Sequence, residues 1–326
     1  MDIGNVFSQR HASSAPVRFG GIYANFNPDN VDAYLKGFHK NPKEHTLKPF
    51  ATRIFRELPT TLAVSKLIGQ SPADIHILGC SDGSEAYAYA ITLKESMGKK
   101  AQGNVKITGI DYTPYLVELA KTGYLVCTDQ EKIWANDTQR APHNPLAQNG
   151  WNQYLEASEA PDNFDALVKQ YPNLSQITRD PVSNIAIGNG MNWYKIRPHG
   201  LPDIHFEVAD MRDYVKRAPA GSKRQVYVAA NALGYIAQQY GPKGFVRVLQ
   251  DIQNNNRGKE TYVVVGQVEH QVFKQAPQLV EFMKALGYEP VSQEQLKSLG
   301  ATQIDKAYGN IWKVNTTIPV KLTFDS

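Results

Sequence analysis

The stretch from Asp74 to Leu93, DIHILGCSDGSEAYAYAITL, constrains the fold more than any other part of the chain. A short apolar run over Ile75, Ile77 and Leu78 leads into a turn that begins and ends with glycine. Small and apolar residues then recur at helical spacing. This order predicts a strand, a glycine turn and a helix. In a doubly wound sheet such a turn lies at the carboxyl end of the first strand, where ligands bind and where glycines let backbone amides approach a nucleoside.

The spacing of the glycines indicates which nucleoside fits. Gly79 and Gly83 do not form the G-x-G-x-x-G of a dinucleotide site, and no Lys-Ser or Lys-Thr follows them as in a phosphate loop. Glu85 at the mouth of the turn would repel a pyrophosphate, but it suits the ammonium and sulfonium groups of S-adenosylmethionine. The alternative interpretation is an ordinary turn between strand and helix, with Ser84 as the helix cap.

A second acidic residue lies at the end of the next predicted strand. The strand from Val105 to Ile110 ends at Asp111, one strand after the glycine turn. A carboxylate there can accept hydrogen bonds from both hydroxyls of a ribose, each worth roughly 1.5–3 kcal/mol. The alternative is that Asp111 caps the next helix, predicted from Pro114 to Lys121, with Pro114 in its first turn.

Further strand and helix patterns follow in alternation. The pattern predicts strands over Asp203 to Val208, Gln225 to Ala230 and Thr261 to Val265, an amphipathic helix over Pro242 to Ile252, and a closing antiparallel pair over Ile311 to Asn315 and Ile318 to Phe324. Strands that alternate with helices are typical of α/β proteins. We therefore expect a doubly wound, mostly parallel, Rossmann-like sheet with an antiparallel C-terminal strand.

Two regions stand apart from this alternation. For residues 1–72 the sequence predicts a short N-terminal helical arm that is irregular up to about residue 28. A helix is predicted from Thr52 to Ile68, and Pro59 kinks or breaks it.

Residues 124–202 are rich in Asn, Gln, Pro and Asp with interspersed aromatics. So long a loop is improbable inside a compact domain, and so many aromatics argue against disorder. We interpret residues 124–202 as a large, helical or irregular insertion that covers the ligand cleft.

Composition excludes several classes of function. The net charge of +4 is spread along the chain, which argues against a nucleic-acid surface. Two cysteines give no disulfide framework, and the eight histidines show no metal-ligand spacing. No apolar run is long enough for a bilayer, and the start lacks the pattern of a secretory signal. These features predict a cytoplasmic protein without a metal, a membrane partner or a nucleic-acid partner.

Four segments together resemble the chemotaxis-receptor glutamate methyltransferases, the CheR type of S-adenosylmethionine-dependent enzyme. The family's G/A-x-S-T-G-E-E-P-Y-S stands here as GCSDGSEAYA from Gly79, its T-x-F-F-R-E as TRIFRE from Thr52, and its strand-four C-R-N-V-M-I-Y-F as AANALGYI from Ala229. The spacing from Asp111 to Gly123 matches the family as well. The resemblance implies that residues 73–326 form a class I methyltransferase domain.

The resemblance also implies which residues form the site. The implied cofactor-binding residues are Thr52, Arg56, Gly79, Ser81, Gly83, Glu85, Asp111, Tyr112, Asp210, Met211 and Asn231. Arg56 and Tyr235 would also face the acceptor and serve as the catalytic residues. Simpler roles stay open for these two, an ion-paired helix residue for Arg56 and a core aromatic for Tyr235.

The departures from the family bear on the acceptor. Ala230 stands where the family has an arginine, Phe50 stands where it has an asparagine, and most of the receptor-docking N-terminal domain is absent. We therefore expect O-methylation of a carboxylate or other oxygen acceptor, a small molecule or a protein, that is not a chemoreceptor and has anionic character. S-adenosylhomocysteine would be the second product. The alternatives are a catalytically silent nucleoside-binding protein and a nicotinamide-dependent oxidoreductase.

Overall fold

The computed structural model describes a little over half of the chain. The described residues are 17–19, 22–24, 54–55, 57–127, 151–172, 192–198, 200–217, 221, 224–230, 232–266, 283–284, 286–300 and 310–315. For 17–19, 22–24, 151, 235 and 237–243 only the backbone is described.

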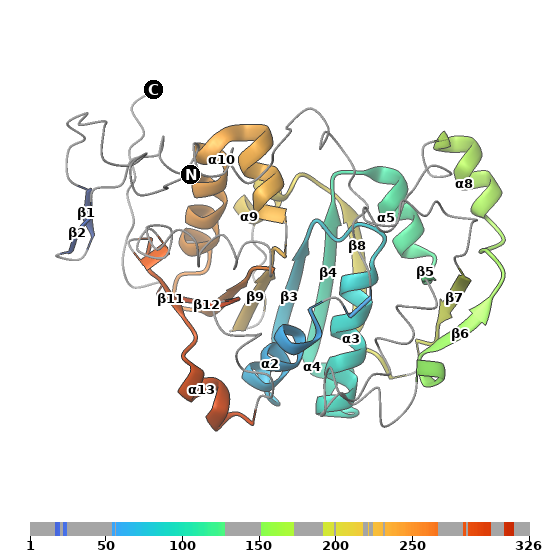
Figure 1. Cartoon of the computed structure of the whole chain (residues 1–326), viewed down its shortest axis with the longest axis horizontal. Helices are drawn as coiled ribbons and strands as arrows, with labels where there is room; N and C mark the ends of the chain where they lie inside the picture. Colours follow the sequence, from blue (N-terminus) through green and yellow to red (C-terminus); the bar gives the residue numbers. More distant parts are fainter. Residues whose placement is uncertain are drawn as a thin grey trace, which may run out of the picture.

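A seven-stranded sheet forms the centre of the molecule (Figure 1). Its strands are β3 (Ala73–Leu78), β4 (Val105–Asp111), β8 (Asp203–Val208), β9 (Arg224–Val228), β10 (Glu260–Val264), β11 (Tyr288–Pro290) and β12 (Ile311–Val314), in the spatial order β11-β12-β10-β9-β3-β4-β8. The first five are mutually parallel, and β12 runs antiparallel to β10 and β11. The predicted doubly wound sheet with an antiparallel C-terminal strand is confirmed.

The predicted tail pair is corrected in part. The described antiparallel neighbours of β12 are β10 and β11, and the predicted partner strand from Ile318 to Phe324 lies outside the described residues. Near the N-terminus, where the sequence predicted irregular structure, β1 (Val17–Phe19) and β2 (Ile22–Ala24) form an antiparallel pair.

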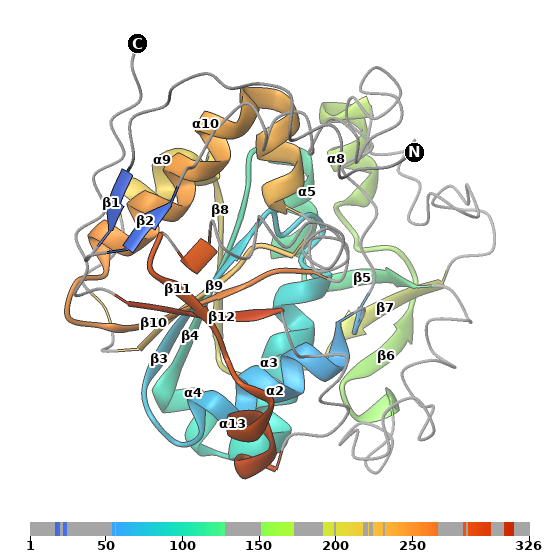
Figure 2. The same ribbon diagram turned by 60° about the vertical axis from the view of Figure 1, so that its left-hand side comes forward.

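Helices cover both faces of the sheet (Figure 2). On one side α2 (Leu58–Ile68), α3 (Ser84–Met97) and α5 (Pro114–Lys121) share one apolar core with the sheet, and α4 (Lys100–Asn104) connects α3 to β4. On the other side α9 (Met211–Lys216) and α10 (Ala232–Asn255) build a second core. The short helix α13 (Gln293–Ser298) follows β11.

Pro59 does not kink its helix as the sequence suggested. It lies in the first turn of α2, where a missing N–H leaves no hydrogen bond broken. The helix therefore begins at Leu58, later than the predicted start at Thr52, and Pro59 helps to define that start.

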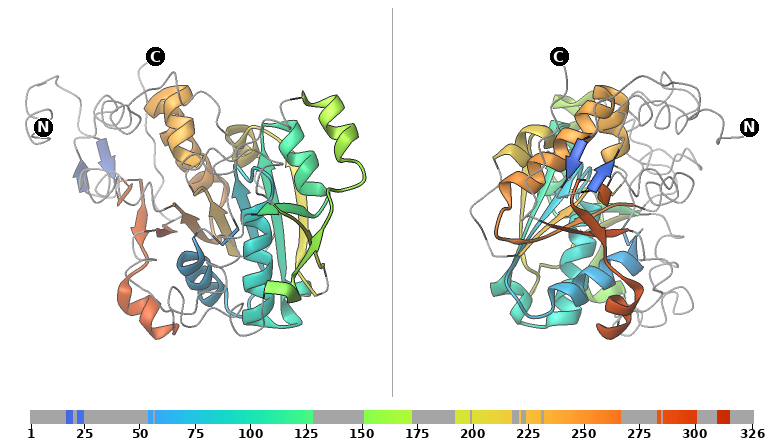
Figure 3. Two further views of the ribbon diagram at one scale, coloured as in Figure 1. Left: turned by 45° about the vertical axis from the view of Figure 1, so that its right-hand side comes forward. Right: turned by 90° about the vertical axis from the view of Figure 1, so that its left-hand side faces the viewer.

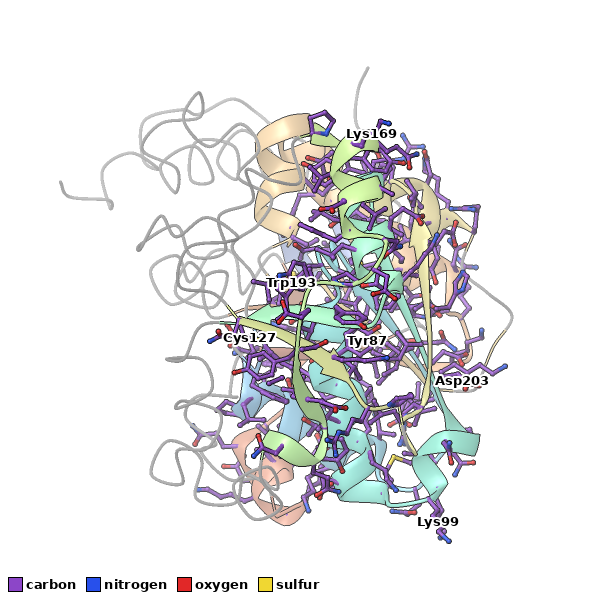
Figure 4. The ribbon with its side chains drawn as sticks, turned by 90° about the vertical axis from the view of Figure 1, so that its right-hand side faces the viewer. Tyr87, Lys99, Cys127, Lys169, Trp193 and Asp203 are labelled. Atoms are coloured by element: carbon purple, nitrogen blue, oxygen red, sulfur yellow. The ribbon has the colours of Figure 1, made fainter. Side chains whose placement is uncertain are left out.

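The segment 124–202 contains a small antiparallel sheet where helical or irregular structure was expected. Its strands β5 (Tyr124–Cys127), β7 (Asn192–Ile196) and β6 (Leu155–Ser158) pair in that order, with the short helices η2 (Trp151–Gln153) and α8 (Phe164–Gln170) beside them. Figure 4 views this side of the molecule and labels Cys127 of β5 and Trp193 of β7. The described part of the segment packs against α3 and α5 (Figure 3), and its predicted place over the cleft concerns residues that the structure does not describe.

Phe206 of β8 joins the first core to the glycine turn. A Cβ atom added at Gly109 of β4 would lie 2.6 Å from Phe206 Cδ1 and 3.1 Å from Cys80 Cβ. A Cβ atom added at Gly83 would lie 3.0 Å from Phe206 Cζ. Both glycines thus leave room for one aromatic ring, which packs at 5.6 Å from the ring of Tyr87 on α3.

We predict that Gly109→Ala lowers the free energy of unfolding by about 1–3 kcal/mol, because the added methyl group overpacks a buried contact. Gly103 in α4 is the matched control, since a Cβ atom there meets nothing within 4 Å. Gly103→Ala should be neutral or stabilising by up to about 1 kcal/mol. Urea unfolding of the two variants measures the difference, and equal stabilities would contradict the role given to Phe206.

Candidate cofactor and active site

The carboxyl ends of the five parallel strands lie at one edge of the sheet, here called the carboxyl edge. Ile110 lies beside Leu78, Val208 beside Asp111, and Val228 beside Ile77. In chain order, β4 and β8 are added on one side of β3, and β9 and β10 are then added on its other side. The order therefore reverses at β3, and such a switch point opens a crevice for ligands at the carboxyl edge between β3 and β9.

The turn after β3 has an unusual backbone. Gly79, Ser81 and Gly83 have φ angles of 76°, 52° and 84°, so three alternate residues adopt the left-handed conformation. Ser81 and Phe55 are the non-glycine residues with positive φ among the described residues. Such conformations cost about 1–3 kcal/mol and cluster at functional sites.

Backbone hydrogen bonds hold this turn and start the next helix. The N–H groups of Gly79 and Cys80 both donate to the carbonyl oxygen of Ile110, at 2.8 Å each. Gly83 is the residue before the helix and makes no side-chain cap, and the Ser84 N–H donates to Asp82 Oδ1 at 3.0 Å. The alternative in which Ser84 caps α3 is therefore wrong.

Asp111 connects the turn to the neighbouring helix. Its Oδ2 accepts the Ser81 N–H and its Oδ1 accepts the Thr113 N–H, both at 2.9 Å. Thr113 is the N-cap residue of α5, so Asp111 is not the cap itself but supports it two residues earlier. A carboxylate has about four acceptor sites, which allows the same group to hold the turn and to bind hydroxyl groups.

Burial changes the acidity of two groups in this turn. It raises the pKa of Asp111 above its ordinary value, and the N–H bonds from Thr113 and Ser81 oppose that rise. Burial, together with the charges of Asp111 and Asp82, also raises the pKa of the Cys80 thiol well above its ordinary value. Cys80 consequently stays protonated, and a thiolate nucleophile has no support here.

The far wall of the crevice comes from the starts of α9 and α10. A Cβ atom added at Gly79 would lie 3.3 Å from Ala232 Cβ and 3.8 Å from Met211 Cε. The structure thus brings Gly79 and Met211, two predicted site residues, close together. A side chain at position 79 would crowd Ala232, and the positive φ of Gly79 favours glycine as well.

Asp210 has a structural role of its own. It is the N-cap of α9, and its Oδ1 accepts the Arg212 N–H at 2.8 Å. The Arg212 guanidinium bonds both carboxylate oxygens and lowers the pKa of Asp210. The carboxylate is thus held charged at the carboxyl edge.

Two apolar side chains are exposed beside Asp111. Tyr112 is 49% and Val208 43% exposed, and they are the large hydrophobic residues that stand out as exposed among those described. Val208 is the last residue of β8, and Tyr112 directly follows the adjacent strand β4. Glu85, in the first turn of α3, is half-buried. An apolar surface next to the carboxylate that is predicted to bind the ribose suits the face of an adenine ring.

Several predicted site residues cannot be placed in this geometry. Thr52, Arg56 and Asn231 lie outside the described residues, as does the side chain of Tyr235. The backbone of Tyr235 is in the first turn of α10, next to the crevice. Within the described residues, no group of three or more His, Cys, Asp and Glu side chains could hold a metal.

One family model matches the part of the chain that contains the glycine turn and Asp111. Residues 44–140 match the family described as "CheR methyltransferase, SAM binding domain". Among solved structures, a protein of Methanococcus maripaludis is similar, and its assignment as an S-adenosyl-L-methionine-dependent methyltransferase is itself provisional. The two are 12% identical with a TM-score of 0.26, over 86% of this chain and 85% of the other. No curated protein matches.

The family match covers less than half of the chain. Residues 44–140 are similar to a CheR-type, S-adenosylmethionine-binding methyltransferase domain, and this similarity supports S-adenosylmethionine as the cofactor. The match contains the glycine turn and Asp111 and ends before β8, and the roles of all the site residues remain predictions. No helix in the described part of the chain is long and apolar enough to span a membrane.

The structure also shows contributors that the sequence analysis missed. Ala232 lies against Gly79, and Thr113 rather than Asp111 occupies the N-cap position of α5. A buried polar group centred on His76 lies beneath α9. The alternation of Asp74 and His76 with Ile75 and Ile77 was the available signal, because it places two polar residues on one face of a fully buried strand.

We predict that Gly79→Ala weakens S-adenosylhomocysteine binding, because the added methyl group fills the approach between the turn and Ala232. Gly98 is the matched control: it too has positive φ, at 63°, but a Cβ atom there meets nothing within 4 Å. Left-handed strain alone costs about 1–2 kcal/mol in each variant. Calorimetry should show a loss of S-adenosylhomocysteine affinity for Gly79→Ala only. Equal affinities of Gly79→Ala and Gly98→Ala would exclude a close approach of the cofactor to the turn at Gly79.

Proposed function

We propose that this protein transfers the methyl group of S-adenosylmethionine to an oxygen of an anionic acceptor, most simply a carboxylate, and forms a methyl ester. The observation that carries the proposal is the carboxyl edge, where the left-handed turn at Gly79, the anchored carboxylate of Asp111 and the start of α9 meet. A CheR-type domain supplies the class of reaction. The chemical class of the acceptor is inferred from the residues of the chain itself.

In this proposal the Asp111 carboxylate accepts hydrogen bonds from both ribose hydroxyls. Tyr112 and Met211 flank the adenine, and Glu85 faces the charged methionine end of the cofactor. The fixed hydrogen bonds of Asp111 support its role, because a carboxylate already held in place loses little entropy when it binds. Asp210, Asn231, Thr52, Ser81 and Gly83 complete the proposed cofactor site, Ser81 and Gly83 through the backbone of the turn.

Beyond the alignment of the two reactants, the reaction requires little from the protein. The cofactor supplies a methyl group on a cationic sulfur, and a new oxygen–carbon bond forms as the sulfur–carbon bond breaks. Holding two reactants in line can contribute about 7–11 kcal/mol, and a carboxylate needs no general base. We assign Arg56 to hold the anionic acceptor and the Tyr235 hydroxyl to position the attacking oxygen.

Position 230 supports an acceptor different from a chemoreceptor glutamate. The family's arginine is replaced by Ala230, which is buried in the turn between β9 and α10. An apolar wall there removes one cationic contact for a carboxylate. The same residue motivates the second candidate, a catalytically silent protein that binds the nucleoside without transferring its methyl group.

We predict that Asp111→Ala weakens S-adenosylhomocysteine binding by about 1.5–3 kcal/mol, because charge-assisted bonds to the ribose are lost. Isothermal calorimetry measures the change. Asp213→Ala is the control, since Asp213 is an exposed carboxylate on α9 that pairs with Lys216. Equal affinities of the two variants would remove the ribose assignment.

The same assignment gives the sign of a pH dependence. The hydroxyls donate to the charged carboxylate, so affinity is complete above the pKa of Asp111 and is lost as the pH falls through it. Because burial raises this pKa, the loss begins at a higher pH than for an ordinary aspartate. Calorimetry across the acidic range should show this loss in the wild type and not in Asp111→Ala.

We predict that the transferred methyl group is released by mild alkali. The protein is supplied with methyl-labelled S-adenosylmethionine and a cell extract, and labelled methanol is collected after alkaline treatment. Label that resists alkali, as an N-methyl group does, would overturn the carboxylate acceptor but not the class. No transferred label despite cofactor binding would favour the silent binder.

Arg56→Ala should reduce turnover on the true acceptor more than it weakens cofactor binding, because the guanidinium aligns the anion. Arg247→Ala is a suitable control, since Arg247 is an exposed residue of α10 with a long contact to Asp251. Equal losses of turnover and of cofactor affinity in Arg56→Ala would mean that Arg56 binds the cofactor and does not align the acceptor.

A further inference from the structure

A chain of buried polar side chains lies between the sheet and α9. Gln225 Nε2 donates to Asp74 Oδ2 at 2.9 Å, and Gln225 Oε1 lies 2.8 Å from His76 Nε2. His76 Nδ1 lies 2.8 Å from the hydroxyl of Tyr214, and the His76 ring stacks on Tyr227 with centroids 4.6 Å apart. We name these five residues the polar layer. It occupies the sheet face that α9 and α10 cover.

The donors and acceptors in this chain run in one direction. The Asp74 carboxylate only accepts, so the amide of Gln225 turns its N–H to Asp74 and its oxygen to His76. His76 Nε2 therefore carries the proton, and its bare Nδ1 accepts the hydrogen bond of the Tyr214 hydroxyl. His76 is 1% exposed, and its burial lowers its pKa, which favours this neutral form.

Tyr214 connects the polar layer to the far wall of the crevice. The Tyr214 N–H donates to the carbonyl oxygen of Asp210 at 2.9 Å, so the two residues are one helical turn apart in a fixed geometry. In α9, Tyr214 and Val215 are the buried residues. Six residues with two buried side chains form a weak element by packing alone. The bond from Tyr214 to His76 ties α9 to β3, and Asn255 of α10 holds the other end of α9 through the carbonyl oxygens of Val215 and Lys216.

We propose that His76 and Tyr214 are positioning residues of the cofactor site, whose hydrogen bond docks α9 and so places Asp210 and Met211 against the nucleoside. The inference rests on the proposed function of those two residues. Neither His76 nor Tyr214 touches the cofactor in this proposal. They act through α9 alone.

The proposal makes docking depend on the charge of His76. If α9 lifted, water would reach the imidazole and its pKa would return toward the ordinary 6.5. Protonation therefore favours the lifted state, and docking weakens as the pH falls below about 6.5 and through the lowered pKa. Around the polar layer lie these titratable or charged groups: Asp74 on β3, Tyr227 on β9, Tyr214 on α9, Arg217 directly after α9, Glu207 on β8 and Lys259 after α10. The two tyrosines have pKa values raised to about 12 by burial and stay neutral in this range.

The first test compares two tyrosines that both contact His76. Tyr214→Phe removes the hydroxyl that binds His76 from α9. Tyr227→Phe removes a buried hydroxyl that bonds to Asn256 and keeps the bond between Tyr214 and His76. Loss of the docking bond should weaken S-adenosylhomocysteine binding about tenfold in Tyr214→Phe. Affinity should change less than about twofold in Tyr227→Phe, although both variants lose stability.

The second test uses the pH profile, which a purely structural role would not change. Wild-type affinity for S-adenosylhomocysteine should fall below pH 6.5 more steeply than that of His76→Gln, which lacks the titrating ring. The difference between the profiles removes the contribution of Asp111, which both proteins share. Should Tyr214→Phe fail to fold, this comparison alone decides.

The outcomes separate this inference from the function on which it rests. Wild-type protein that does not bind S-adenosylhomocysteine at all would contradict the proposed function. Wild-type binding with equal affinity in Tyr214→Phe, or with the same pH profile in His76→Gln, would overturn the positioning role and leave the cofactor site intact.

Discussion

The bond between the Asp111 carboxylate and the Ser81 N–H is the contact on which the crevice depends. The left-handed φ of Ser81 is not a conformation that the turn would keep alone, since side chains disfavour it, whereas Gly79 and Gly83 adopt positive φ readily. A buried carboxylate that accepts the middle N–H offsets this cost. Its second oxygen orders the start of α5, so one side chain fixes two helices relative to the carboxyl edge. A parallel sheet makes this possible because β3 and β4 end at the same level.

The two faces of the sheet are packed with different kinds of side chain. On the α3 side the core is apolar and depends on small residues, such as Gly83 and Gly109, that admit Phe206. On the α9 side a polar layer crosses from β9 to β3, with Asp74 beside Gln225 and His76 beside Tyr227. A shift of one residue between these strands would separate every one of these partners, so the polar layer specifies register where an apolar surface would tolerate a slip.

The sheet could be predicted from the sequence because its signals are local. Each parallel strand is a short apolar or alternating run with a turn signal, and Asp203–Val208 was predicted to the residue. The small sheet was missed because β5, β6 and β7 are short and lie far apart in the chain, so only their pairing reveals them. At the site, spacing predicted the turn and Asp111. The contact of Ala232 with Gly79 could not be predicted, since it depends on how α10 packs.

The small sheet has a consequence for any acceptor-binding role of the segment 124–202. The Ile196 N–H donates to the Gly123 carbonyl oxygen at 2.8 Å, so the segment leaves and returns beside the end of α5. The Tyr154 hydroxyl bonds to Glu95 of α3, and the Tyr87 hydroxyl donates to the Ala120 carbonyl oxygen at 2.9 Å. Both ends of the segment are therefore fixed to the two helices that Asp111 and the glycine turn also fix. Whatever the rest of the segment contributes, it does so from a base that is rigid with respect to the cofactor half of the sheet. Such a base allows specificity to vary in the segment without disturbing cofactor binding.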